Sequence, residues 1–167
     1  MLSTDQKGSI AETAIIHAAV KLGIDVYKPV SDGTRCDLIF DLGSELVRVQ
    51  CKWASRHGDV IAVLCYSSRR SRDGLLRRPY TAEEVDAFAA YCADVDCCYF
   101  MRIAQFPGRQ QILLRLAPTR NNQKLGINWA EAYEFGATLG TSGAVAQLGE
   151  RQSGTLEAAG SSPAGST

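Results

Sequence analysis

The sequence predicts an α/β domain in which helices flank a mixed β-sheet. Near the N-terminus, apolar residues recur at the three- and four-residue spacing of an amphipathic helix. Most later apolar segments are short, have the length of strands and end at glycine or other turn-forming residues. The 167 residues suffice for one domain with a sizeable core, and we assign that domain to residues 1–142.

The first half of the chain is expected to hold one helix followed by strands. The helix should cover residues 4–22, with Thr4 and Asp5 as caps at its start and Gly23 at its end. A hairpin is predicted around Gly43-Ser44. The expected strands, in order, are residues 24–30, 36–42, 46–54 and 60–66.

The second half should add a helix, two strands and a short final helix. Thr81 and Glu84 have the spacing of a capping box, which predicts a helix from Thr81 to Cys92. The expected strands are residues 96–103 and 111–116, and the short helix is residues 128–135.

Composition and charge exclude several functions. Hydrophobic residues make up 46% of the chain and the formal net charge is zero. No apolar run is long enough to span a membrane, and the N-terminus has no signal-peptide pattern. We therefore expect cytoplasmic residence and no membrane partner. The six cysteines are not spaced as C-x-x-C pairs and the two histidines stand apart, which argues against a zinc site.

Positive charge is concentrated in the segment Ser67–Tyr80, which reads SSRRSRDGLLRRPY and is expected to be a loop. A basic loop on a neutral domain can contact nucleic-acid phosphates, or it can be an ordinary solvated loop. The residues of this segment alone leave both interpretations open.

Residues 143–167 differ in composition from the rest of the chain. They are rich in Gly, Ala and Ser and contain no aromatic residue, which predicts a disordered tail. The strings VAQLGER and GSSP can be encoded by the D-arm and T-arm of a tRNA gene. The 25 codons match the length of such a gene and permit pairing in its stems. We infer an in-frame translation of a tRNA gene, without a catalytic role.

Asp37, Gln50 and Lys52 are the leading candidates for a catalytic site. Along residues 46–54 the side chains alternate between two faces, so Gln50 and Lys52 point to the same side. The hairpin should bring Asp37, near the start of the partner strand, close to them. A carboxylate, an amide and an ammonium then converge, although the same residues could form a solvated strand face.

Such a group suits phosphodiester hydrolysis. Mg²⁺ or Mn²⁺ takes oxygen ligands, which Asp37, the Gln50 amide and the Cys51 backbone carbonyl can supply. A bound metal activates water and offsets charge on the phosphate. Lys52 can orient or deprotonate the water, or stabilise the phosphate. Glu12 could hold the metal through water, or be a solvated helix residue.

The joint pattern of these residues resembles the PD-(D/E)xK nuclease superfamily. It is most similar to the small homing endonucleases associated with group I introns in tRNA genes. The matching stretches are KGSIAETAIIHAAVKLGIDVYKPV, RCDLIFDLGSELVRVQCKWA, RRPYTAEEVDAFAAYC and RLAPTRNNQKLGINWAEAYEF. The resemblance implies a restriction-endonuclease-like core, Mg²⁺-dependent cleavage of double-stranded DNA, and catalytic roles for Glu12, Asp37, Gln50 and Lys52.

Two positions depart from the superfamily's pattern. Cys36 stands where proline usually precedes the aspartate. Gln50 stands where most members have Asp or Glu, which removes a negative charge and should weaken cation binding. The homing enzymes of tRNA introns also carry glutamine there, so Gln50 favours that subgroup.

Double-stranded DNA is the expected partner. A chain this small should form a homo-oligomer, a dimer or a tetramer, to reach both strands. Polar side chains before Asp37 and in two later segments could contact phosphates or bases, or could be ordinary surface residues. The candidate DNA contacts are Ser31, Thr34, Arg35, Arg69, Arg70, Arg72, Arg77, Arg78, Arg120 and Asn122.

Two alternatives to a homing endonuclease stay open. The same fold could serve a Holliday-junction-resolving or repair nuclease. It could also be a DNA-binding module that has lost cleavage, for which the missing carboxylate at Gln50 is the only support.

Overall fold

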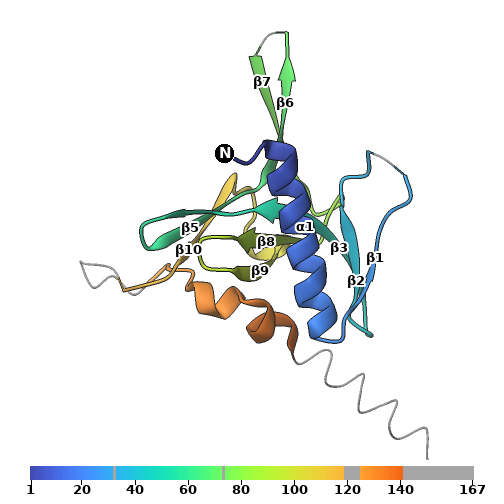
Figure 1. Ribbon diagram of the computed structural model, residues 1–167, viewed down its shortest axis with the longest axis vertical. Helices are drawn as coiled ribbons and strands as arrows, with labels where there is room; N and C mark the ends of the chain where they lie inside the picture. Colours follow the sequence, from blue (N-terminus) through green and yellow to red (C-terminus); the bar gives the residue numbers. More distant parts are fainter. Residues whose placement is uncertain (32, 73, 119–124, 141–167) are drawn as a thin grey trace, which may run out of the picture.

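The computed structural model describes residues 1–31, 33–72, 74–118 and 125–140 (Figure 1). Two of the candidate DNA contacts, Arg120 and Asn122, and the predicted tail at 143–167 lie outside the described residues. The elements in chain order are α1 (Thr4–Lys21), β1 (Asp25–Tyr27), β2 (Leu38–Asp41), β3 (Leu46–Trp53), β4 (Ser55–His57), β5 (Val60–Leu64), β6 (Tyr66–Ser71), β7 (Gly74–Pro79), β8 (Ala87–Cys92), β9 (Cys97–Arg102), the 3-10 helix η1 (Ile103–Gln105), β10 (Gln111–Arg115) and the 3-10 helix η2 (Ala130–Tyr133).

A mixed sheet of five described strands, in the order β1-β2-β3-β8-β9, forms the centre of the molecule. β3 and β8 run parallel, and the other neighbours are antiparallel. α1 packs against one face through Ala11, Ile15 and Ala19 (Figure 1). The sheet β10-β5-β4 covers the other face, where Ile61 packs in one cluster with Phe88. The predicted α/β class on a mixed sheet is confirmed.

The start of α1 has a different cap from the one predicted. The cap is Ser3 rather than Thr4 or Asp5: its Oγ accepts from the Gln6 backbone N at 3.2 Å, and Gln6 Oε1 accepts from the Ser3 backbone N at 2.9 Å. This reciprocal pair satisfies two N–H groups near the helix start. At the other end, Gly23 adopts a φ of +75°, which glycine tolerates and which turns the chain toward β1.

The prediction of a helix from Thr81 to Cys92 is wrong. The second half of this segment is the central strand β8. The capping contact exists, since the Thr81 backbone N donates to Glu84 Oε2 at 3.3 Å, but it closes only a turn. Asp86 then bonds to Arg48 on β3, and residues 87–92 continue parallel to that strand. A strand buried on both faces shows no alternation, so its apolar run could not be told from a buried helix.

The basic segment is also not a loop. β6 and β7 pair antiparallel over six residue pairs, from Tyr66 opposite Pro79 to Ser71 opposite Gly74. This hairpin projects from the body of the molecule beyond the N-terminal end of α1 (Figure 1). Its arginines therefore stand on a ribbon that extends away from the two sheets.

The remaining predicted elements differ mainly at their ends. β1 is shorter than predicted, and β4 was not predicted. The expected helix at 128–135 is divided between η2 and a helical segment at residues 135–140. No described helix is both long and apolar enough to cross a membrane.

Candidate active site

The β2–β3 hairpin places Asp37 opposite Gln50. Leu38 pairs with Val49 in the ladder, and the Asp37 backbone N donates to the Val49 carbonyl at 2.9 Å. Leu38 and Val49 are fully buried beneath α1. A slip of one residue would turn both out of the core, so burial fixes this register. Asp37 and Gln50 consequently share the opposite face of the hairpin.

The Asp37 carboxylate accepts a hydrogen bond from β3 at the point where the β2–β3 ladder ends. β2 begins at Leu38, so the Cys51 backbone N–H, which points toward β2, lies beyond the last strand pair. Asp37 Oδ2 accepts from this N–H at 2.9 Å and also from Gln50 Nε2. Two bonds to one oxygen hold the carboxylate against β3. Gln50 itself is 8% exposed, and it is the one buried polar residue in the described part of the chain.

The oxygen atoms at this end of the β2–β3 hairpin suit a hard cation. Gln50 Nε2 also lies 3.4 Å from the Cys51 carbonyl oxygen, so the amide bridges that oxygen and Asp37. With the amide rotated by half a turn, its own oxygen would join the other two, and three oxygens are a ligand set for Mg²⁺ or Mn²⁺. Within the described residues no group of three or more His, Cys, Asp or Glu side chains could hold a metal. One carboxylate, one amide and one carbonyl therefore form the candidate set.

Glu12 of α1 lies at the same edge. Its carboxylate pairs with Lys28 Nζ at 2.5 Å. Burial raises the pKa of Asp37, the Cys51 N–H lowers it, and the Glu12 carboxylate raises it again. The hydrogen bond that Lys28 donates to Glu12 raises the pKa of Lys28, and the negative charge of Asp37 raises it further. Glu12, Lys28 and Asp37 thus form one electrostatic cluster, of which Lys28 was not predicted from the sequence.

Lys52 completes the site. Its Nζ donates to the Tyr66 carbonyl oxygen at 3.0 Å and to the Tyr80 hydroxyl at 3.4 Å. Burial lowers the pKa of Lys52 to about 8, although the Asp37 carboxylate opposes this change. An ammonium with this pKa changes charge near neutral pH, which is common at functional sites. The structure therefore places Glu12, Asp37, Gln50, Cys51 and Lys52, the candidates named from the sequence, near one another, and their roles stay predictions.

Arg35, which the sequence offers as a candidate DNA contact, is half-buried and makes several contacts within the chain. Its guanidinium donates to Ser67 Oγ and to the Pro79 carbonyl, each at 2.9 Å. It also lies 3.3 Å from Glu84 Oε2, and its Cζ is 3.9 Å from the centroid of the Tyr80 ring. These contacts fix the base of the hairpin to the turn before β2. Sequence reasoning missed Tyr80, because no local pattern indicates that its ring meets Arg35 and Lys52.

The other described candidate DNA contacts are accessible. Ser31 and Thr34 are exposed, and Thr34 Oγ1 donates to the Cys36 carbonyl at 2.9 Å. All five arginines of the hairpin are exposed, but two of them have partners. Arg78 pairs with Glu84, and the Arg77 guanidinium lies 5.0 Å from the centroid of the Tyr66 ring.

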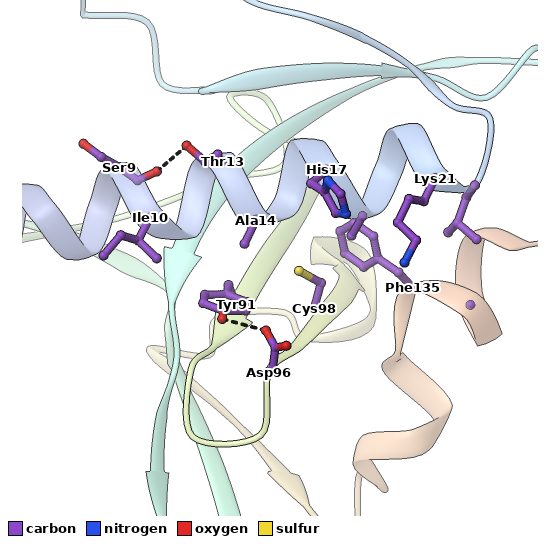
Figure 2. Close-up of a pocket in the computed structure, with 13 residues that line it drawn as sticks. Ser9, Ile10, Thr13, Ala14, His17, Lys21, Tyr91, Asp96, Cys98 and Phe135 are labelled. Atoms are coloured by element: carbon purple, nitrogen blue, oxygen red, sulfur yellow. Dashed lines mark hydrogen bonds between the residues drawn. The ribbon is translucent and has the colours of Figure 1, made fainter.

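A cavity of about 820 Å³ lies on a different side of the molecule. It is formed by one face of α1, including Ile10 and His17, against Tyr91, Cys98 and Phe135 (Figure 2). Among the described residues, none of the candidate catalytic residues lines this cavity. The Tyr91 hydroxyl in it already donates to Asp96 Oδ1 at 2.8 Å (Figure 2). Among the described residues, the edge of the β2–β3 hairpin, unlike this cavity, combines a carboxylate, an amide and a carbonyl oxygen with a lysine whose pKa is lowered, so we take that edge as the candidate active site.

A family model described as PD-(D/E)XK endonuclease matches residues 2–136. The chain therefore belongs to the PD-(D/E)XK endonuclease family, whose members cut DNA and generally use divalent metals. It is also similar to a solved structure described as a bacterial homing endonuclease, I-Ssp6803I. The identity is 27%, the match covers 92% of this chain and 100% of that one, and the TM-score is 0.66. No curated protein matches the chain. The superfamily inferred from the sequence is thus confirmed.

Proposed function

We propose that this endonuclease is a Mg²⁺-dependent enzyme that cuts double-stranded DNA at a specific sequence, and that it is of the homing type. The observation that carries the proposal is the convergence of Asp37, Gln50 and the Cys51 carbonyl beside Lys52. Bound Mg²⁺ supplies an activated water and positive charge at the phosphate. Mn²⁺ would suit the same oxygens.

The groups of the site would have different roles. Asp37, the Gln50 amide and the Cys51 backbone carbonyl would hold the metal, with Glu12 assisting through water. The Lys52 ammonium lies on the same face as Asp37 and Gln50, where it orients the attacking water or stabilises the charge that develops on the phosphate. Because burial disfavours its charge, any new anion beside it interacts strongly.

The β6–β7 hairpin is the proposed DNA-reading element. A two-stranded β-ribbon fits the major groove, and its six residue pairs span about 20 Å. By the alternation of side chains, each face of the ribbon carries two arginines and one exposed leucine, which can contact phosphates, guanines and thymine methyl groups. One face holds Arg69, Leu76 and Arg78, and the other holds Arg70, Leu75 and Arg77.

Several observations support the proposals that the enzyme is of the homing type and that it forms a homo-oligomer. The similar solved structure is described as a homing endonuclease, and Gln50 matches the subgroup that the sequence resembles. The tRNA-like codons at 143–167 suggest a gene beside a tRNA locus. Since the described part of the chain carries one such site, we propose that a homo-oligomer, a dimer or a tetramer, cuts the two strands. A DNA substrate also fits the cytoplasmic residence expected from the sequence.

The test is to incubate the purified full-length chain and Mg²⁺ with duplex DNA that carries a tRNA gene and to map the breaks. We expect breaks at one defined position that disappear in EDTA. Asp37→Ala and Lys52→Ala should abolish cleavage while DNA binding persists. The matched exposed controls Asp25→Ala and Lys21→Ala should cleave normally.

Other outcomes would select an alternative. Preferential cutting of four-way junctions would favour a resolving or repair nuclease. Binding without cleavage in the wild-type chain would favour a DNA-binding module. Normal cleavage in both Asp37→Ala and Lys52→Ala would refute the assigned site.

A further inference from the structure

The base of the β6–β7 hairpin holds Lys52 from two sides. The carbonyl that accepts from its ammonium belongs to Tyr66, the first residue of β6, and the hydroxyl belongs to Tyr80, directly after β7. Tyr66 pairs with Pro79 in the ladder, so both contacts arise where the hairpin joins the body. The first contact is a backbone group that most residues would supply. The second depends on the side chain at position 80.

The Tyr80 side chain contacts the ammonium with its ring as well as its hydroxyl. Lys52 Nζ lies 4.4 Å from the ring centroid, within the range of a cation–π interaction. An ammonium has three N–H donors. The Tyr66 carbonyl and the Tyr80 hydroxyl take two of them, and the third is left for water or phosphate. Burial raises the pKa of the Tyr80 hydroxyl, which keeps it neutral beside the cation.

The Tyr80 ring is itself fixed on several sides. The Arg35 guanidinium carbon lies 3.9 Å from its centroid, and the Tyr80 and Phe88 rings pack edge to face at a centroid separation of 5.7 Å. Phe88 is nearly fully buried and pairs with Gln50 across β3 and β8. The Tyr80 backbone N donates to the Cys65 carbonyl at 3.3 Å. A ring held in this way can hold a flexible lysine in turn.

We propose that Tyr80 is a positioning residue for DNA cleavage, which sets the place of the Lys52 ammonium without itself contacting the reacting atoms. The inference rests on the proposed function, because it assigns Lys52 a role in the cleavage step. A displacement of about 1 Å at a catalytic group can slow a reaction roughly 100-fold. Tyr80→Leu should therefore slow cleavage by roughly that factor, while Tyr80→Phe, which keeps the ring, should lose much less.

The test compares full-length wild type, Tyr80→Phe and Tyr80→Leu on DNA that the wild type cleaves with Mg²⁺. Tyr133→Leu is the matched control, since Tyr133 packs on Phe106 away from these contacts. Single-turnover rates at saturating protein measure the cleavage step, and titrations in Ca²⁺ measure DNA affinity. We expect a large loss of rate in Tyr80→Leu alone, with affinity nearly unchanged in all variants.

A second measurement needs no activity. Because the ammonium lies over the Tyr80 ring, the adjacent Lys52 methylene protons should show an upfield ring-current shift in NMR spectra. The shift should persist in Tyr80→Phe and vanish in Tyr80→Leu.

Each remaining outcome would overturn the inference. These are wild-type rates in Tyr80→Leu, a loss confined to affinity, equal losses in both Tyr80 variants, or no ring-current shift at Lys52. If the wild type cuts no DNA, the proposed function falls as well, whereas cutting that does not depend on Tyr80 removes this inference alone.

Discussion

Replacing Lys52 by methionine should stabilise the metal-free protein while abolishing cleavage. A fall in the pKa of Lys52 from 10.5 to about 8 means that the fold disfavours the charged form by roughly 3 kcal/mol, at about 1.4 kcal/mol per pKa unit. Methionine fills similar space without charge. It leaves the Tyr66 carbonyl without its 3.0 Å donor, which costs about 1 kcal/mol. We therefore expect a net gain of about 2 kcal/mol at pH 7.

The pH dependence of this gain follows from the lowered pKa. Below pH 8, Lys52 is charged in both the folded and the unfolded states, so the full free-energy cost of burying its charge is present. Between about pH 8 and 10.5 the unfolded chain holds more protons than the folded chain, and the stability contribution from Lys52 rises with pH. The advantage of Lys52→Met should consequently shrink across that window.

Urea unfolding in EDTA, followed by circular dichroism at several pH values, measures the free energy of unfolding. Lys21→Met, which removes an exposed ammonium from the last turn of α1, should change it by less than about 0.5 kcal/mol. A Lys52→Met protein that is less stable than wild type at pH 7 would falsify this reasoning. So would a gain that does not decline above pH 8.

Three further outcomes are expected. Asp37→Asn should raise the melting temperature in EDTA and abolish cleavage, because burial disfavours the ionised Asp37; a lower melting temperature would contradict this. Arg48→Met should cost about 2 kcal/mol of stability through lost charged hydrogen bonds to Asp86. The hydrogen bond from Arg48 holds the pKa of Asp86 below its usual value of 3.8. The loss of stability caused by Arg48→Met should therefore shrink in urea titrations carried out at pH values low enough to protonate Asp86 in the folded protein. A chain ending at residue 142 should cleave DNA as the full chain does in the same mapping assay, and a lost or altered cut would refute the assignment of 143–167 as dispensable.

The candidate site was predictable because it depends on short-range structure. Gly43 allows the turn between β2 and β3, with a φ of +79°. Alternating apolar residues then decide which face Gln50 and Lys52 occupy. Asp37 lies only thirteen residues from Gln50, so one hairpin suffices to bring them together. The same reasoning would work for any catalytic group carried by two arms of one turn.

Other features could not be predicted from the sequence, because distant parts of the chain decide them. β8 is a strand because β3 offers a parallel partner and both sheet faces are covered, and neither fact is visible in AFAAYC. Arg35 turns inward because Glu84 and Tyr80, more than forty positions later, receive it. Lys52 is buried by the same hairpin base. The perturbed pKa of Lys52 is thus a tertiary property that its Q-x-K spacing could not supply.

Glutamine at position 50 resolves a conflict between folding and metal binding. A glutamate there would place a second carboxylate against Asp37, whose pKa burial already raises, and one of the two would have to hold a proton. The glutamine amide instead donates to Asp37 and to the Cys51 carbonyl, which satisfies both oxygens without a metal. If the amide turned by half a turn, the Asp37 and Cys51 oxygens would be free to bind a metal, and the amide oxygen of Gln50 would face the same site. If Gln50 binds the metal as proposed, it gives a well-bonded metal-free site and should hold the cation more weakly than a carboxylate would, because one ligand charge is missing.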